Sequence, residues 1–183
     1  MPTEIHVYFE GDESLRPGFK AFFRELSDRA AKKRRPVRFI PGRSRDAARK
    51  DFETALRDPT VWPVLLIDSE GPVRRTANTP NADQTFWMVE MMEAWFHADK
   101  EALAMFYRNG FRNTALKPNP KVEEIPKADL ERGLKAATRG CQKGAYHKTS
   151  HAPKLLALIR PDLVRRAAPN CDRLFRAVLD HLH

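Results

Sequence analysis

The chain has 183 residues, with 33 Lys and Arg against 24 Asp and Glu and a formal net charge of +9. A surplus of this size favours an acidic partner such as nucleic acid, although a basic solvated surface is an equally good interpretation. The two cysteines are too few for a disulfide framework. Because we find no run of about 18 apolar residues and no basic leader, we expect a cytoplasmic protein without a membrane span.

The first half of the chain alternates predicted strands and helices. The strands are β-branched or apolar, and the third is apolar nearly throughout, as a strand covered on both faces must be. The helices carry apolar stripes at helical spacing, and Ser44 or Asp46 is the expected N-cap of the second. The pattern predicts strands over residues 4–10, 37–42 and 61–68, with helices between them over 17–35 and 44–58.

The second half is dominated by predicted helices and loops. A polar loop over 71–84 precedes "FWMV", which we interpret as a short fourth strand followed by a helix from about Glu90. Met88, Met91, Met92, Trp95 and Phe96 are expected in the core. An extended loop over 108–126 and an irregular basic segment over 139–153 flank a helix over 127–138, and two further helices cover 154–159 and 170–182.

Together these elements predict a single α/β domain over residues 1–183. Strands that alternate with helices favour a mainly parallel sheet with right-handed crossovers. We expect a four-stranded sheet flanked by helices in residues 1–107, and a loop and helical C-terminal extension in 108–183.

Acidic residues follow two of the predicted strands. Glu10 and Gly11 end the first strand, and Asp68 and Glu70 end the third, in "VLLIDSEGP". Ligands of open parallel sheets bind outside the carboxyl ends of the strands, so these carboxylates are expected to converge there. A divalent cation, Mg²⁺ or Mn²⁺, would relieve their repulsion. The competing interpretation is that they are turn residues and a solvated strand end.

At these residues the chain resembles a Toprim-like domain, as found in topoisomerases, primases and OLD-type nucleases. The Toprim pattern is a strand that ends in Glu-Gly and a later strand that ends in Asp-x-Asp. "YFEG" and "LLIDSE" fit it, except that Glu70 replaces the final Asp and reaches one methylene further. That departure puts the second metal position, or cleavage itself, in doubt.

Nearly the whole chain also resembles a family of small bacterial Toprim-like proteins, domain of unknown function family 4276. The segments that carry this resemblance are "PVLLIDSE", "MVEMMEAWFHADKEAL", "NPKVEEIPKADLE" and "YHKTSHAPKLL". The resemblance implies a Toprim-like fold and a Mg²⁺-dependent site that cuts or joins phosphodiesters. It also implies a phage-defence-type system with an ABC-type or SMC-like ATPase partner.

Basic and histidine residues are candidates for the same chemistry. Lys148 can neutralise a phosphate oxygen, and Arg43, at the carboxyl end of the second strand, can contact a phosphate. His147 is a candidate acid or base, and the role of His151 stays open. The alternative for all four is solvated surface.

Two further metal arrangements are weaker candidates. Glu93, in an apolar setting, is a possible fourth metal ligand or a partner of an arginine, and the alternative for it, as for Glu90, is an exposed helix-face residue or a structural ion pair. Zinc ligation by Cys141, His147, His151 and Cys171 has a spacing that matches no compact zinc motif.

The leading hypothesis is a metal-dependent nuclease or phosphotransfer component that acts on nucleic acid, with DNA preferred over RNA. Glu10, Asp68, Glu70 and Lys148 would be catalytic, the three acids and Glu93 would bind metal, and Arg43 and Lys148 would bind phosphate. The chief alternative is a regulatory or effector subunit that docks an ABC/SMC-like ATPase without catalysis. A plain nucleic-acid-binding module is a third hypothesis, but it leaves the converging acids unexplained.

Overall fold

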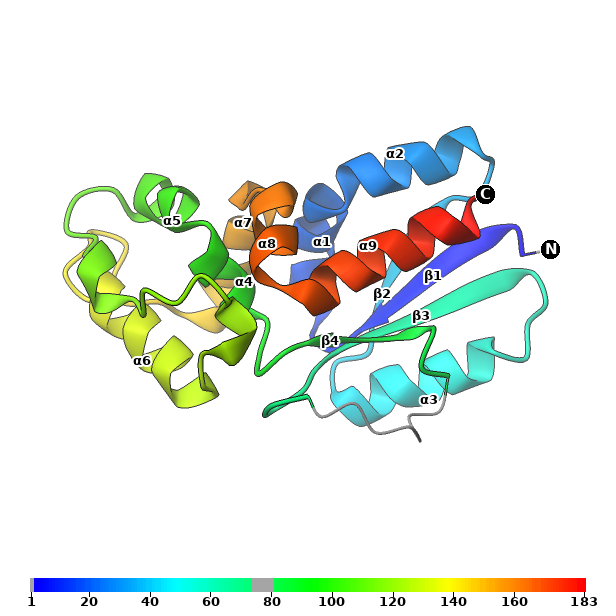
Figure 1. Ribbon diagram of the computed structural model, residues 1–183, viewed down its shortest axis with the longest axis horizontal. Helices are drawn as coiled ribbons and strands as arrows, with labels where there is room; N and C mark the ends of the chain where they lie inside the picture. Colours follow the sequence, from blue (N-terminus) through cyan, green and yellow to red (C-terminus); the bar gives the residue numbers. More distant parts are fainter. Residues whose placement is uncertain (1, 74–80) are drawn as a thin grey trace.

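The computed structural model describes residues 2–73 and 81–183 and has an α/β architecture (Figure 1). Four strands form one sheet in the order β2-β1-β3-β4, and every neighbouring pair is parallel. The predicted four-stranded α/β sheet with C-terminal helices is therefore confirmed. Its strands are β1 (Glu4–Phe9), β2 (Val37–Pro41), β3 (Val61–Asp68) and β4 (Thr85–Met88).

Helices cover both faces of the sheet, and further helices lie beyond its carboxyl edge. In chain order they are α1 (Arg16–Phe22), α2 (Arg24–Lys32), α3 (Arg45–Ala55), α4 (Glu93–Ala98), α5 (Lys100–Tyr107), α6 (Lys127–Thr138), α7 (Lys148–Leu158), α8 (Pro161–Ala167) and α9 (Pro169–His181). Short 3-10 helices lie at Glu13–Leu15, Asn113–Ala115 and Val122–Glu124. In the part of the chain that the structure describes, no helix has the length and apolar character to cross a membrane.

The two faces of the sheet belong to two hydrophobic clusters. Alternate side chains of β1, such as Val7 and Phe9, pack with α1, α2, α7 and α9 in the larger cluster. Tyr8 lies on the opposite face, where it packs with Leu65 and with Phe52 of α3. Figure 1 shows α2 and α9 on one side of the sheet and α3 on the other. Because β3 is covered on both sides, its apolar run is explained, as expected.

Tertiary packing changes several predicted helix boundaries. The helix expected over 17–35 is broken at Phe23, whose backbone (φ −94°, ψ 18°) leaves the helical region. Phe22 and Phe23 are both buried, and a straight helix would direct adjacent residues about 100° apart. The helix expected from about Glu90 begins at Glu93 and divides at Asp99, whose carboxylate accepts the Ala102 N–H and caps α5.

The predicted boundaries in the second half of the chain also differ from those in the structure. The irregular segment predicted over 139–153 is wrong in its last part, since α7 begins at Lys148 and contains Pro153. Helix α7 packs closely on α1 at this proline, since a Cβ at Gly18 would lie 2.6 Å from the Pro153 carbonyl oxygen. Helix α8, which begins with Pro161, had no predicted counterpart. Residues 74–80 of the loop predicted over 71–84 lie outside the described residues.

Candidate metal centre

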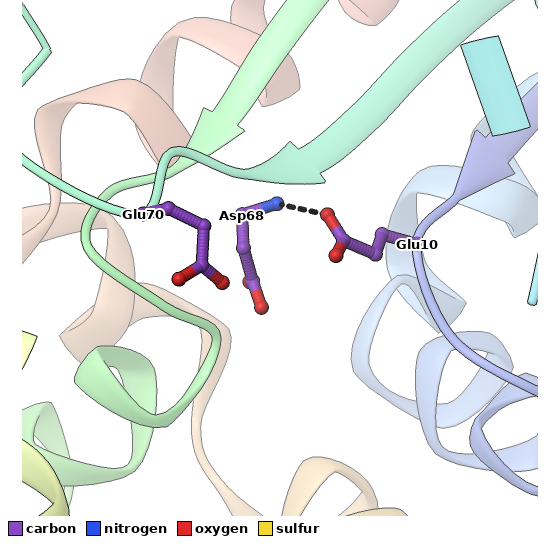
Figure 2. Close-up of side chains that lie close together, drawn as sticks. All are labelled: Glu10, Asp68 and Glu70. Atoms are coloured by element: carbon purple, nitrogen blue, oxygen red, sulfur yellow. Dashed lines mark hydrogen bonds between the residues drawn. The ribbon is translucent and has the colours of Figure 1, made fainter. Parts of the chain in front are cut away.

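Three carboxylates converge at the carboxyl edge of the sheet, as predicted. Strands β1 and β3 are adjacent and parallel, so Glu10, one residue past β1, lies beside Asp68, the last residue of β3. One carboxylate oxygen from each of Glu10, Asp68 and Glu70 lies within 4.8 Å of the others. Figure 2 shows Asp68 between the other two side chains.

Asp68 is the buried member of the cluster, with 4% of its surface exposed. Its Oδ1 accepts the Met92 N–H at 2.8 Å, and its own N–H donates to Glu10 Oε2 at 3.2 Å (Figure 2). Burial raises the pKa of Asp68 to about 7; Glu93 and Glu10 add to the rise, and Lys148 opposes it. A bound cation would favour the ionised carboxylate, so proton and metal compete at this oxygen.

The loops around the acids have unusual backbone conformations. Gly11 has φ +136°, and the non-glycine residues Arg43, Glu70 and Glu90 have φ values of +62°, +57° and +63°. Left-handed backbone costs about 1–2 kcal/mol for a residue with a Cβ. Hydrogen bonds between loops compensate: Arg43 N–H donates to the Gly11 carbonyl at 2.8 Å, and Glu70 N–H donates to the Glu90 carbonyl at 3.1 Å. Such strain concentrates at functional sites in many proteins.

Three basic side chains balance the three acids. Arg45 donates to the Asp68 carbonyl oxygen at 2.6 Å, and its Nε lies 3.5 Å from Glu10 Oε2. Lys127, the first residue of α6, forms an ion pair with Glu70. Lys148, the first residue of α7, lies 3.8 Å from Asp68 Oδ2. The acids are thus held together by cations that an incoming metal ion would have to displace or share.

A pocket of about 260 Å³ opens beside Glu10 and Asp68. Arg43 and Lys148, both predicted to contact phosphate, line this pocket, as does Thr149 in the first turn of α7. The pocket therefore presents carboxylates and cations to the same space, which is the combination that a metal-bound phosphate requires.

Glu93 lies next to the pocket but outside the carboxylate cluster. Its side chain is 1% exposed, and Oε1 accepts the Tyr146 hydroxyl at 2.8 Å. Lys148 lies between the two acids, with Nζ 3.9 Å from Glu93 Oε1 and 3.8 Å from Asp68 Oδ2. The arrangement makes Glu93 a partner of Lys148 and Tyr146, and burial next to this carboxylate raises the pKa of Tyr146.

The histidine and cysteine candidates do not form a metal site. Within residues 2–73 and 81–183, Glu10, Asp68 and Glu70 make up the one group with suitably placed ligand atoms. His151 is buried, and its Nδ1 accepts the His147 N–H at 3.2 Å and lies 2.9 Å from the Tyr107 hydroxyl. Cys141 and Cys171 are free and buried. Glu90, expected on an exposed helix face, is buried before α4, where Oε2 accepts the Lys127 N–H.

Sequence reasoning missed Arg45, Lys127 and Tyr146 as neighbours of the site. Arg45 lies two residues after Arg43, which was placed at the correct edge, but nothing in the sequence singles out Arg45. Lys127 lies 57 positions from Glu70 and Tyr146 lies 53 positions from Glu93. No local signal connects such pairs.

The oxygen spacing suits a hard divalent cation. Opposite oxygens of a Mg²⁺ site are about 4.2 Å apart, twice the metal–oxygen distance of about 2.1 Å. The upper limit of 4.8 Å between the carboxylate oxygens is slightly wider than this. A small side-chain movement or a bridging water would close the difference, and the donor set, all carboxylate oxygens, is the one that Mg²⁺ and Mn²⁺ prefer.

The chain was also compared with models of protein families. The model of a domain of unknown function, DUF4276, matches residues 12–179. The chain belongs to the DUF4276 family. The matched part includes Asp68, Glu70 and Lys148, whereas Glu10 precedes it. No curated protein and no solved structure matched the chain, so membership of DUF4276 supplies a family and no activity.

Proposed function

We propose that the protein is a Mg²⁺- or Mn²⁺-dependent enzyme that cuts or joins phosphodiesters in nucleic acid. The observation that carries this proposal is the convergence of Glu10, Asp68 and Glu70 within 4.8 Å at the carboxyl edge of the sheet. A Toprim-like site, which the strand-end residues resemble, would use the same positions. The net charge of +9 supports a polyanionic substrate.

Each side chain has a role that follows from its position. Glu10, Asp68 and Glu70 would hold the cation, which when bound polarises a phosphate oxygen or lowers the pKa of a water. Lys148, at the start of α7, and Arg43, between β2 and α3, both line the pocket and would bind and orient the phosphate. Arg45 fixes the relative position of the two strand ends through Glu10 and the Asp68 carbonyl.

A nuclease assay tests the proposal directly. Labelled DNA and RNA would be incubated with the protein in Mg²⁺, in Mn²⁺ and in EDTA. We expect metal-dependent cutting that Glu10→Gln and Asp68→Asn each reduce by at least about 100-fold, because both remove a ligand charge without changing shape. Glu101→Gln, which removes an acid whose side chain is 79% exposed, is the matched control and should retain full activity. Activity that survives both site substitutions would refute the metal mechanism.

A non-catalytic subunit is the second candidate, favoured by one observation. Each acid already has a basic neighbour, in the pairs Glu10–Arg45, Glu70–Lys127 and Asp68–Lys148. A self-neutralised cluster of this kind would serve as a structural element. The protein would then neither bind Mg²⁺ nor cut nucleic acid. A Mg²⁺ titration followed by thermal unfolding separates the candidates, since only a metal site raises the midpoint. The ATPase partner of this second candidate, like the phage-defence setting, has the sequence resemblance as its support.

A further inference from the structure

The positive charge of the protein is concentrated in one segment. Residues 16–50 contain 13 Lys and Arg against three Asp and Glu, a net charge of +10. The rest of the chain contains the remaining 20 Lys and Arg and 21 Asp and Glu, a net charge of −1. The whole surplus of the chain therefore comes from this segment, which includes α1, α2, β2 and the first six residues of α3.

The fold places this segment around one edge of the sheet. Strand β2 is the edge strand in the order β2-β1-β3-β4. Figure 1 shows α1 and α2 on one side of the sheet and α3 on the other. The chain passes from α2 through β2 to α3, so the basic segment wraps the β2 edge and forms one side of the molecule, which we call the basic edge.

Two groups of exposed cations flank β2 along the chain. Lys32, Lys33 and Arg34 precede the strand, and Arg43, Arg49 and Lys50 follow it. All six are exposed, and among the described residues no acidic side chain forms an ion pair with any of them. Cations that lie close together without an ion-pair partner repel one another, and a polyanion would relieve that repulsion.

The basic edge leads to the metal centre. Arg43 lines the pocket that contains Glu10 and Asp68, and the hydrogen bond from its backbone N–H to the Gly11 carbonyl fixes it there. The five residues of β2 span about 17 Å at about 3.3 Å per residue. That length corresponds to about five base-pair steps along the axis of a DNA duplex. A backbone that contacts both groups of cations would therefore place a nearby phosphate at the pocket.

We propose that the basic edge binds the sugar-phosphate backbone of nucleic acid and directs it to the metal centre. This inference rests on the proposed function for the class of ligand, but it concerns binding and not cleavage. The contacts are to phosphates, so binding is independent of base sequence and strongly dependent on salt.

The experiment measures binding of the full chain to a fluorescein-labelled DNA duplex of about 20 base pairs by fluorescence anisotropy, in EDTA so that no cutting occurs. Two variants remove charge from the basic edge, and a third removes it elsewhere. They are Lys32→Gln/Lys33→Gln/Arg34→Gln, Arg49→Gln/Lys50→Gln, and the control Lys135→Gln/Arg139→Gln/Lys143→Gln, whose residues are also exposed.

We expect the first variant to weaken binding at least about 10-fold at about 0.1 M salt. The slope of log affinity against log salt should fall by up to about 3 in magnitude, since each phosphate contact contributes about 0.9. The second variant should lower the slope by up to about 2, and the control should bind within about twofold of wild type. Circular dichroism confirms that each variant is folded.

The inference would be overturned by a wild-type protein that does not bind the duplex, or by a control variant that weakens binding as much as the first variant. A first variant that binds as tightly as wild type would also overturn it. Failure of the proposed function looks different. In that case the duplex binds through the basic edge, but no cutting follows when Mg²⁺ or Mn²⁺ is added.

Discussion

Asp68→Asn should show how much stability the protein loses by burying this carboxylate, separately from the role of Asp68 as a metal ligand. In the folded protein, burial raises the pKa of Asp68 from 3.8 to about 7. The unfolded chain therefore loses this proton at lower pH than the folded chain does. The contribution of Asp68 to the free energy of unfolding is fully present below about pH 4 and is lost as the pH rises toward about 7. Asparagine has the same shape, can still accept the Met92 N–H, and never ionises.

The size of the effect follows from the two pKa values. Each pKa unit is worth about 1.4 kcal/mol, so a difference of about three units corresponds to on the order of 4 kcal/mol at pH 8. Without divalent cations, Asp68→Asn should be more stable than wild type by up to that amount at pH 8. At pH 4 the two proteins should have nearly equal stability. Mg²⁺ at about 100 times its dissociation constant should stabilise wild type by about 2.7 kcal/mol and leave the variant unchanged.

The assay is urea denaturation of both proteins at pH 4 and pH 8, with EDTA or with Mg²⁺, followed by circular dichroism. The comparison uses the difference between the proteins, which cancels the titration of groups that do not interact with Asp68. A difference in stability that is the same at both pH values would refute the raised pKa of the buried Asp68 carboxyl group. A variant that gains as much stability from Mg²⁺ as wild type would refute Asp68 as a ligand.

Three further substitutions test other parts of the molecule. Lys127→Gln should raise the affinity for Mg²⁺ up to about fivefold in calorimetric titration, because an exposed ion pair that competes for the metal is worth at most about 1 kcal/mol; a loss of affinity would contradict this. Gly11→Ala should destabilise the fold by about 1–3 kcal/mol in urea, since φ is +136° and the new Cβ would lie 2.4 Å from Leu15 Cδ1; wild-type stability would show that this loop adapts. Asp99→Ala should cost about 1–2 kcal/mol in the same assay, because it removes the side chain that caps α5 at the Ala102 N–H and that accepts the Arg160 N–H; wild-type stability would contradict the role of that cap.

Local patterns were sufficient to predict the sheet. Strand β3 and helix α6 have the bounds expected from their apolar runs, 61–68 and 127–138. The choice between Ser44 and Asp46 as N-cap needed the structure, in which Ser44 Oγ accepts the Ala47 N–H at 3.2 Å. Helix breaks were missed because they depend on packing partners that are distant in sequence, as at Phe23.

The candidate site was predictable only where its contacts follow from the order of the strands or from residue type. Parallel strands bring their carboxyl ends to one edge, so the meeting of Glu10 with Asp68 follows from topology. Lys148 and Arg43 were identified by residue type and lie in the same pocket. The pairing of Lys127 with Glu70 depends on how α6 docks, which no periodicity encodes.

The larger hydrophobic cluster runs from Ile5 to Leu182 and joins the first strand to the last helix. A shortened version that stops at residue 107 would lack α6, α7 and α9, and so would leave one face of the sheet without much of its cover. It would also lose Lys127 and Lys148. We expect such a fragment to aggregate on expression, and a protease that cleaves the intact chain between α5 and α6 to leave two pieces that stay associated.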